Sequence, residues 1–341
     1  MITWVDGGDA AWQAEKNRYG KEMYPAGASA LRRAENDDSD ERYRDWDNLK
    51  YWFRGVEKYA PWVRKIHFVT WGHLPEWLLT SHPKLHIVRH EEYIPEKYLP
   101  TFNSHTIEWH MHKISGLSER FVYFNDDIFL LKAVAERDFF EGGLPCDMLA
   151  FQPVVANPDN PVMSHIFLNN SIVLSKYFTK RDNVKGQIGN YLKPGYPPLY
   201  FFYNILELTF PLFTGFYTVH GPSPFLKSAF ELLWEKEGEL LDTTCSHRFR
   251  SEADVNQYLI REWQKLTGRF KAKNITRHFR YFDVESDNPK LIDTILRQRA
   301  NIICINDANN PIDFAYAKGQ IKGAFEKIFP EQSSFEKGHG I

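Results

Sequence analysis

Cysteine is scarce in this chain, and its three cysteines stand far apart. Cys146, Cys245 and Cys304 are the only ones among 341 residues. Their spacing excludes a disulfide-rich secreted domain and the closely spaced ligand pairs of a zinc finger. Sparse cysteines of this kind are typical of buried thiols in a reducing compartment, so we expect a cytoplasmic protein.

The chain also shows no strong excess of charge, no long apolar run and no signal-peptide pattern in its first residues. Its formal net charge is −2, whereas a protein that binds nucleic acid is usually basic. No stretch of about 18 apolar residues occurs, which argues against a membrane-spanning helix. The first residues, MITWVDGGDA, do not show the charged-then-apolar pattern of a signal peptide. We therefore expect no nucleic-acid partner and no transmembrane segment.

Aromatic residues, by contrast, are abundant and make up 16% of the chain. Most rings of this kind pack the core and its rim, and others stack on sugars or bases. The composition is therefore compatible with glycan binding without establishing it.

Short apolar runs alternate with helical patterns along the chain. The runs have the length of strands and are mostly apolar throughout, as in strands covered on both faces: 2–6, 65–71, 84–90, 120–126, 148–155 and 216–221. Helical patterns occupy the residues 45–59, 104–114, 224–237 and 251–265. This alternation predicts an α/β fold with a mainly parallel, Rossmann-like sheet flanked by helices.

We expect one catalytic domain over residues 1–275 and an extension over 276–341 that packs on it. Residues 181–204 are rich in Gly, Pro and aromatic residues, and we interpret them as a long inserted loop. A helix followed by a strand is predicted for 289–306. The last residues, 331–341, are predicted to be loose.

Acidic residues stand where two predicted strands end. Asp6 and Gly7 follow the first strand, and Asn125, Asp126 and Asp127 follow the fourth. Ligands of open α/β sheets bind at the carboxyl ends of the strands. Adjacent carboxylates suit a hard cation such as Mg²⁺ or Mn²⁺ that is shared with phosphate oxygens. A simple turn or helix cap explains the acid pair equally well.

A second polar cluster lies on the helix predicted over 104–114. Three of its residues share one face: His105, Glu108 and His112. The spacing is not that of a zinc protease, so we do not expect a dedicated zinc site. His110 falls on another face and is expected to be exposed. Asn103 and Ser104 could cap the helix or hold a hydroxylated ligand.

His220 ends a predicted strand, next to a turn that two prolines make rigid. Histidines are often structural, but one in this position is a candidate general base because its free pKa lies near neutrality.

Arg248 and Arg250 directly precede the helix predicted over 251–265. A helix N-terminus repels cations, so the pair makes better sense if an anion such as a diphosphate also binds there. Solvated arginines, or a bridge to Glu252, are the alternative.

Four sequence blocks in this order resemble the Stealth family of sugar-phosphate transferases. They are ITWVDGGDAAW, the stretch from DNLKYWFRGVEKY to FVYFNDDIFLL, TVHGPSPFLKSAFELLWEKE and RFRSEADVNQYL. The family includes bacterial capsule and exopolysaccharide phosphotransferases and the catalytic part of N-acetylglucosamine-1-phosphotransferase. The blocks cover about half of the chain. Trp109 and Lys113 depart from the expected pattern, and the first strand is short.

The resemblance implies a GT-A-like fold, a divalent Mg²⁺ or Mn²⁺ ion, and transfer of a sugar-1-phosphate. The donor would be a nucleotide sugar, UDP-linked like UDP-GlcNAc, and the acceptor a hydroxyl of a glycan or glycolipid, which allows peripheral contact with a membrane. Carried over by position, the implied catalytic residues are Asp6, His220 and Arg250. The implied substrate-binding residues are Arg54, Asn103, His105, Glu108 and Asn125, and the residue patterns described above add Gly7 and Arg248 to them. The implied metal ligands are Asp126 and Asp127.

In the mechanism that we expect, an acceptor hydroxyl attacks the sugar-bearing phosphorus and nucleoside monophosphate leaves. His220 is the expected base, and Asp6 either competes for that role or orients the histidine. Two alternatives stay open: a metal-dependent glycosyltransferase that releases nucleoside diphosphate, and a glycan-binding module without activity. The sequence does not indicate the oligomeric state.

Overall fold

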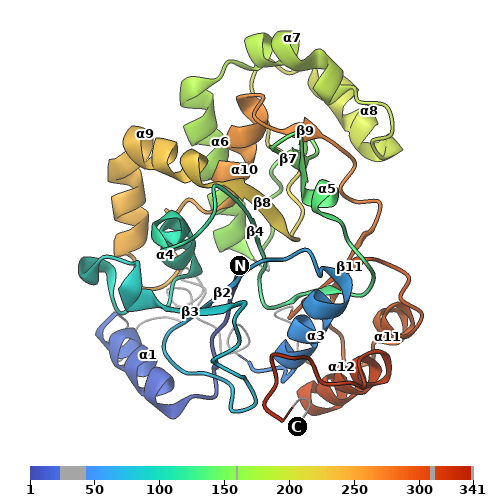
Figure 1. Cartoon of the computed structure of the whole chain (residues 1–341). Helices are drawn as coiled ribbons and strands as arrows, with labels where there is room; N and C mark the ends of the chain where they lie inside the picture. The colour runs from blue at the N-terminus through green and yellow to red at the C-terminus, as the bar shows by residue number, and fades with distance from the viewer. Residues whose placement is uncertain (24–43, 159, 308–311, 339–341) are drawn as a thin grey trace.

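The computed structural model describes residues 1–23, 44–158, 160–307 and 312–338 (Figure 1). Its central sheet begins with three parallel strands: β1 (Ile2–Thr3), β2 (Ile66–Thr70) and β3 (Leu85–Arg89). β4 (Arg120–Tyr123) lies beside β1 through a parallel bridge between Ile2 and Phe124. β8 (Ser223–Leu226) pairs antiparallel with β4. The predicted Rossmann-like α/β fold is therefore confirmed.

Helices cover this sheet and share the apolar core with its strands. They are α1 (Ala10–Met23), α3 (Leu49–Tyr59), α4 (Ser104–Trp109), α6 (Pro161–Tyr177), α9 (Lys227–Ser246) and α10 (Tyr258–Leu266). The predicted stripe of α3 is buried and includes Trp52, Phe53 and Val56, as expected for an amphipathic helix against a sheet. Short 3-10 helices span His90–Glu92, Glu96–Tyr98 and Met111–Lys113.

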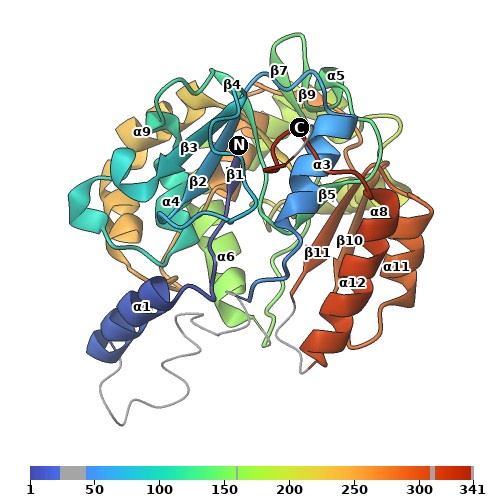
Figure 2. The same ribbon diagram turned by 60° about the horizontal axis from the view of Figure 1, so that its bottom comes forward.

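A second sheet stands beside the first, and two of its three strands come from the C-terminal segment (Figure 2). Its strands are β10 (Phe279–Asp283), β11 (Ile302–Asn306) and β5 (Ile128–Leu130). It is flanked by α11 (Pro289–Leu296) and α12 (Phe314–Ile328). The predicted helix and strand within 289–306 are thus confirmed. β11 pairs antiparallel with β5, so the C-terminal segment is fastened directly behind the Asp126–Asp127 turn.

Residues 181–204 are not the predicted loop. They belong largely to α7 (Lys180–Tyr191) and α8 (Pro198–Glu207), which project from one edge of the molecule (Figure 1). Pro198 opens α8, where proline costs no helical hydrogen bond. Burial outweighs the weak helix propensity of this segment, because the Tyr191 ring stacks on Phe151 at 4.7 Å. Sequence patterns dominated by Gly and Pro conceal such tertiary contacts.

Three other predicted elements also differ from the structure. Residues 148–155 and 216–221 do not form the predicted strands and are joined by an isolated bridge between Phe151 and Phe216 and by a hydrogen bond from the Tyr217 amide to the Ala150 carbonyl. The helix predicted from residue 224 begins at Lys227, after β8. The remaining elements are short: α5 (Glu136–Phe139), β6 (Phe140–Glu141), β7 (Leu144–Asp147) and β9 (Lys271–Ala272).

The prediction of a loose tail is wrong for residues 331–338. The packed tail also determines which groups Arg54 contacts. Phe335 is only 2% exposed, and Glu336 forms an antiparallel bridge with Leu78. Arg54 donates two hydrogen bonds to the Glu336 carboxylate, at 2.7 and 2.6 Å, and a third to the Phe329 carbonyl. The Arg54 guanidinium therefore anchors the tail and is not available to a ligand.

We predict that Glu336→Ala lowers the free energy of unfolding by about 3 kcal/mol, because it leaves the buried Arg54 charge without its partner. Urea denaturation followed by tryptophan fluorescence measures this change. Glu141→Ala is the matched control, since Glu141 pairs with Lys271 at an exposed site where solvent screens the attraction. Equal stability of the two variants would contradict the anchoring role.

Candidate active site

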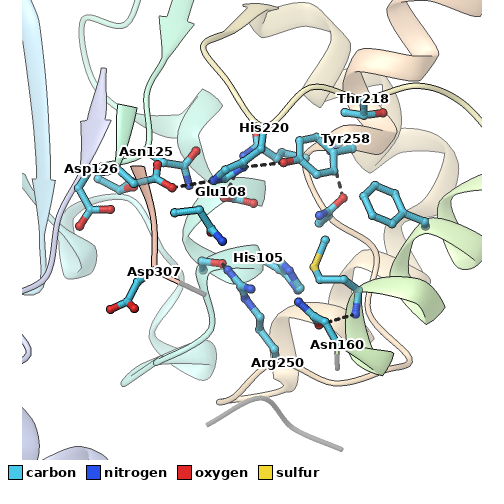
Figure 3. Close-up of a pocket in the computed structure, with 18 of the residues that line it drawn as sticks. His105, Glu108, Asn125, Asp126, Asn160, Thr218, His220, Arg250, Tyr258 and Asp307 are labelled. Atoms are coloured by element: carbon cyan, nitrogen blue, oxygen red, sulfur yellow. Dashed lines mark hydrogen bonds and ion pairs between the residues drawn. The ribbon is translucent and has the colours of Figure 1, made fainter. Parts of the chain in front are cut away.

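A deep pocket of about 1090 Å³ lies at the carboxyl ends of β1 and β4 (Figure 3). Residues of α4, α6, the segment before β8 and the ends of β10 and β11 complete its wall. Both sheets therefore contribute to one site. Seven of the predicted site residues line it: His105, Glu108, Asn125, Asp126, Asp127, His220 and Arg250.

His220 is held between two partners inside this pocket. Its Nε2 lies 2.9 Å from Asp127 Oδ2, and its Nδ1 lies 2.9 Å from the Tyr258 hydroxyl. Burial disfavours the charged imidazole, but attraction to Tyr258 and Asp127 outweighs it, and the pKa of His220 is raised well above its ordinary value. The pair therefore holds a proton over the neutral range until a ligand changes its surroundings.

Asp126 and Asp127 diverge, because the chain turns directly after β4. The Asp127 side chain reaches His220, whereas Asp126 points toward another part of the pocket (Figure 3). Desolvation by the surrounding protein and the charge of Asp127 raise the pKa of Asp126 to about 7, although the residue itself is exposed. A bound cation would reverse both effects, because it favours the ionised carboxylate.

Arg250 and Glu108 also line the pocket (Figure 3). Arg250 donates to the Ser104 hydroxyl from Nε and Nη2, at 3.1 and 2.7 Å. Glu108 accepts hydrogen bonds from Tyr123 and Gln257. Burial nevertheless raises the pKa of Glu108 to about 7, so this carboxyl is a second group that can exchange a proton near neutral pH.

Asp254 connects three polar side chains on this side of the site, and no sequence pattern indicated it. Its carboxylate is fully buried and lies 2.9 Å from His105 Nδ1 and 2.6 Å from His247 Nδ1. It also accepts from Asn103 Nδ2. These partners outweigh the cost of burial and hold the pKa of Asp254 at about 2. In the sequence, the acid is concealed within a pattern that looks like a helix start.

That inward carboxylate also explains why the helix predicted from residue 251 begins only at Tyr258. Arg248 and Arg250 consequently do not precede a helix N-terminus, so the anion site predicted at that terminus does not exist. Arg248 instead donates to the Pro100 carbonyl and stacks over the Tyr19 ring. Only Arg250 of the pair lines the pocket.

Asp6 lies next to the pocket wall but does not meet His220. Its Oδ1 accepts a hydrogen bond from the Gly8 amide at 2.8 Å. This contact closes a local turn, and Gly7 lies within that turn. The partners of His220 are Asp127 and Tyr258, so the expectation that Asp6 orients the histidine is wrong. Asn103 is buried beneath the site, where its side chain caps α4 and binds Asp254.

The two other histidines of the second cluster are structural. His110 is fully buried rather than exposed, and its Nδ1 bonds to the Thr106 carbonyl. His112 stacks on Phe230 and does not share the pocket with His105, because the α-helix ends at Trp109.

The C-terminal segment adds pocket residues for which the sequence offered no motif. They are Tyr281, Asp283, Ile305, Asn306 and Asp307. The Tyr281 ring lies 6.4 Å from the His220 ring. Only the pairing of β11 with β5 places this segment at the site.

The fold and site together define an α/β protein with a large polar pocket at the carboxyl edge of its sheet, where nucleotides and other ligands bind. Residues 42–146 match the family model described as Stealth protein CR2, conserved region 2. The chain belongs to the Stealth family.

Relatives of this chain match it over nearly its whole length. The capsular polysaccharide phosphotransferase WcwK of Streptococcus pneumoniae is 40% identical, over 99% of this chain and 97% of that protein. The receptor polysaccharide phosphotransferase WefC of Streptococcus oralis is 36% identical, over 98% of each. The exopolysaccharide phosphotransferase cps2G of Lactiplantibacillus plantarum is 33% identical, over 99% and 95%.

Within the described residues, no helix has the length and apolar composition to cross a bilayer.

We predict that Asp127→Asn lowers the pKa of His220, because it removes the negative charge that favours the imidazolium. Histidine NMR titration of both proteins measures the two midpoints. His247 is the internal control, since Asp254 raises its pKa independently of Asp127. If the His220 midpoint stayed unchanged in Asp127→Asn, the pairing described above would be incorrect.

Proposed function

We propose that this chain is a phosphotransferase of capsule or exopolysaccharide synthesis. It transfers a sugar-1-phosphate from a nucleotide sugar, UDP-linked like UDP-GlcNAc, to a hydroxyl of a glycan acceptor and releases nucleoside monophosphate. The observation that carries the proposal is the single pocket that joins a histidine–carboxylate pair, Asp127 and His220, with the Arg250 guanidinium. The names of the full-length relatives support the reaction class.

The histidine–carboxylate pair would accept the proton of the acceptor hydroxyl. As that proton leaves, the hydroxyl oxygen bonds to phosphorus, and the phosphorus–oxygen bond to the nucleoside monophosphate breaks. Because the pKa of His220 is raised, the basic form of the pair becomes more populated as pH rises. Turnover should therefore increase with pH through the neutral range.

Arg250 would offset the charge of the donor diphosphate. Its guanidinium has a planar array of donors that matches two phosphate oxygens at once. Ser104 accepts from Nε and Nη2, so the hydroxyl orients the fork against the pocket wall. Phosphoryl transfer depends mainly on such positioning and charge neutralisation.

Asp126 and Asp127 are the residues that would hold Mg²⁺ or Mn²⁺. Carboxylate oxygens fit a hard cation, and because the two side chains diverge, one of them would be the direct ligand. When bound, such an ion supplies positive charge to the diphosphate. Asp126 is the better candidate for direct contact, because Asp127 Oδ2 is already engaged by His220.

The released nucleotide distinguishes this proposal from its alternatives. Incubation with UDP-GlcNAc, acceptor glycan and Mg²⁺ should yield UMP, and the transferred sugar should keep its anomeric configuration because its anomeric bond is not broken. UDP as the product would indicate a glycosyltransferase instead. Glycan binding without any nucleotide product from a panel of nucleotide sugars would indicate a binding module.

We predict that His220→Asn and Arg250→Lys each lower kcat at least about 100-fold, since base catalysis and a bidentate phosphate contact are each worth this much or more. Steady-state measurement of UMP release tests both. Arg297→Lys is the matched control, because the Arg297 side chain is 70% exposed and pairs only with Asp293 at the surface. Near-normal kcat in either pocket variant would refute the assigned role.

We also propose that the enzyme works at the inner face of a membrane, through an exposed apolar surface on α8 and the segment directly after it, called the α8 surface below. This α8 surface comprises side chains between 42% and 73% exposed: Leu199, Phe202, Ile205, Leu206, Leu208, Phe210 and Leu212. Between Lys193 and Lys227 the sequence has one acidic residue, Glu207, and its buried carboxylate is neutralised by Lys180 at 2.9 Å. An uncharged apolar helix face is typical of interfacial binding.

Two further observations favour a membrane as the occupant of the α8 surface. Arg181 and Lys185 are exposed on neighbouring α7, which suits anionic lipid headgroups. The chain that follows the α8 surface reaches a pocket-lining residue, since the Thr214 carbonyl accepts from the amide of Val154. Gly215 permits this contact, since a Cβ there would lie 2.5 Å from the Gln152 carbonyl oxygen.

We predict that a Phe202→Glu, Leu206→Glu double variant loses most of its co-sedimentation with vesicles of anionic phospholipid, because burying two carboxylates in the interface is unfavourable. Tyr316→Glu is the control, since Tyr316 is 55% exposed on distant α12. Size-exclusion chromatography of the same proteins tests the rival occupant. If the wild type were dimeric and did not bind vesicles, and the double variant were monomeric, a second copy of the chain would cover this surface instead.

A further inference from the structure

A thiol completes a three-residue cluster at the end of the pocket. Asp127 comes from the turn after β4, His220 from the segment before β8, and Cys304 from β11. Asp127 Oδ2 lies 2.9 Å from His220 Nε2 and 3.3 Å from Cys304 Sγ. The three ligand atoms all lie within 4.8 Å of one another. The proton transfer proposed above does not require a sulfur atom at this position.

The donor set of this cluster differs from that of a magnesium site. It offers one carboxylate oxygen, one imidazole nitrogen and one sulfur, a combination that suits Zn²⁺ or Co²⁺ and does not suit Mg²⁺. Zn²⁺ forms bonds of about 2.0–2.3 Å to these atoms in a tetrahedral arrangement. The side chains would therefore need only small adjustments from their present separations to surround an ion.

Two observations besides the cluster itself indicate that an ion could be accepted here. Asp127 Oδ1 is buried and has no hydrogen-bond partner among the described residues, although such atoms are nearly always satisfied. The side chains of His220 and Asp127 retain 32% and 21% exposure, and both line the pocket. The pocket therefore offers an entry path to these two ligands, while Cys304 is fully buried.

We propose that Asp127, His220 and Cys304 form a binding site for a soft divalent cation such as Zn²⁺. On binding, the Cys304 thiol and the His220 imidazolium each release a proton to solvent, and His220 coordinates through Nε2 as the neutral imidazole. The ion then occupies the nitrogen lone pair that would accept the acceptor proton. The site is consequently inhibitory, and this consequence, unlike the binding itself, rests on the proposed phosphotransferase function.

Cobalt binding tests the site without any measurement of activity. Metal-free protein titrated with CoCl₂ should develop a thiolate-to-cobalt charge-transfer band at one equivalent, and ZnCl₂ should abolish that band. Cys304→Ser should lose it and weaken Zn²⁺ binding by at least about 10–100-fold, a loss that even outer-shell changes produce. Cys146→Ser and Cys245→Ser are matched controls, because both cysteines are buried and free but lie outside the cluster. Both should retain the band.

An absent thiolate band in the wild type, or a band that persists in Cys304→Ser, would overturn the proposal. Circular dichroism verifies that each variant is folded, and Asp127→Asn provides a second ligand variant if Cys304→Ser is not. With UMP release as the assay, Zn²⁺ should inhibit the wild type in excess Mg²⁺, reversibly by chelator, and inhibit Cys304→Ser only at higher concentrations. If no UMP is formed by any protein, the cobalt spectra still decide the metal site, so the two failures are distinguishable.

Discussion

The contact between the Asp127 carboxylate and the His220 imidazole is the interaction on which the rest of the site depends. Asp127 reaches the imidazole with its side chain, while its backbone carbonyl accepts from the Ile305 amide at 2.8 Å. One residue thus joins the loop before β8 to the second sheet. A displacement of β11 would move the carboxylate, so the C-terminal segment, although remote in sequence, belongs to the construction of the pocket.

The number of hydrogen-bond donors around each acid decides its charge in this pocket. Asp254 is fully buried, yet two histidines and an amide hold its pKa at about 2. Glu108 and Asp126 have fewer compensating partners, and their pKa values rise to about 7. The same type of side chain therefore serves as a permanent anion at one position and as a group of variable charge at two others. This contrast gives the pocket a rigid support next to groups that a ligand can reset.

Local patterns predicted part of this arrangement well. The apolar run of β2 and the stripe of α3 are signals that need no distant partner, and both elements form as expected. The acids at the end of β4 and His220 before β8 also meet at one site. Long side chains were predicted poorly, because their direction depends on remote residues. Arg54 binds a carboxylate 282 positions away and Arg248 a carbonyl 148 positions away.

The sequence by itself determined the α/β class, the position of the acid pair at a strand end and the family, because these follow from periodicity and from contiguous motifs. Only the tertiary structure decided which side chains share the pocket. It separated Arg54, Arg248 and Asp6 from the predicted set, added Tyr258 to the pocket, and placed the buried Asp254 next to His105 outside the pocket lining. The physical reason is that hydrogen-bond partners and burial are set by segments that pack together from distant parts of the chain, such as β5 against β11, and no local pattern records that pairing.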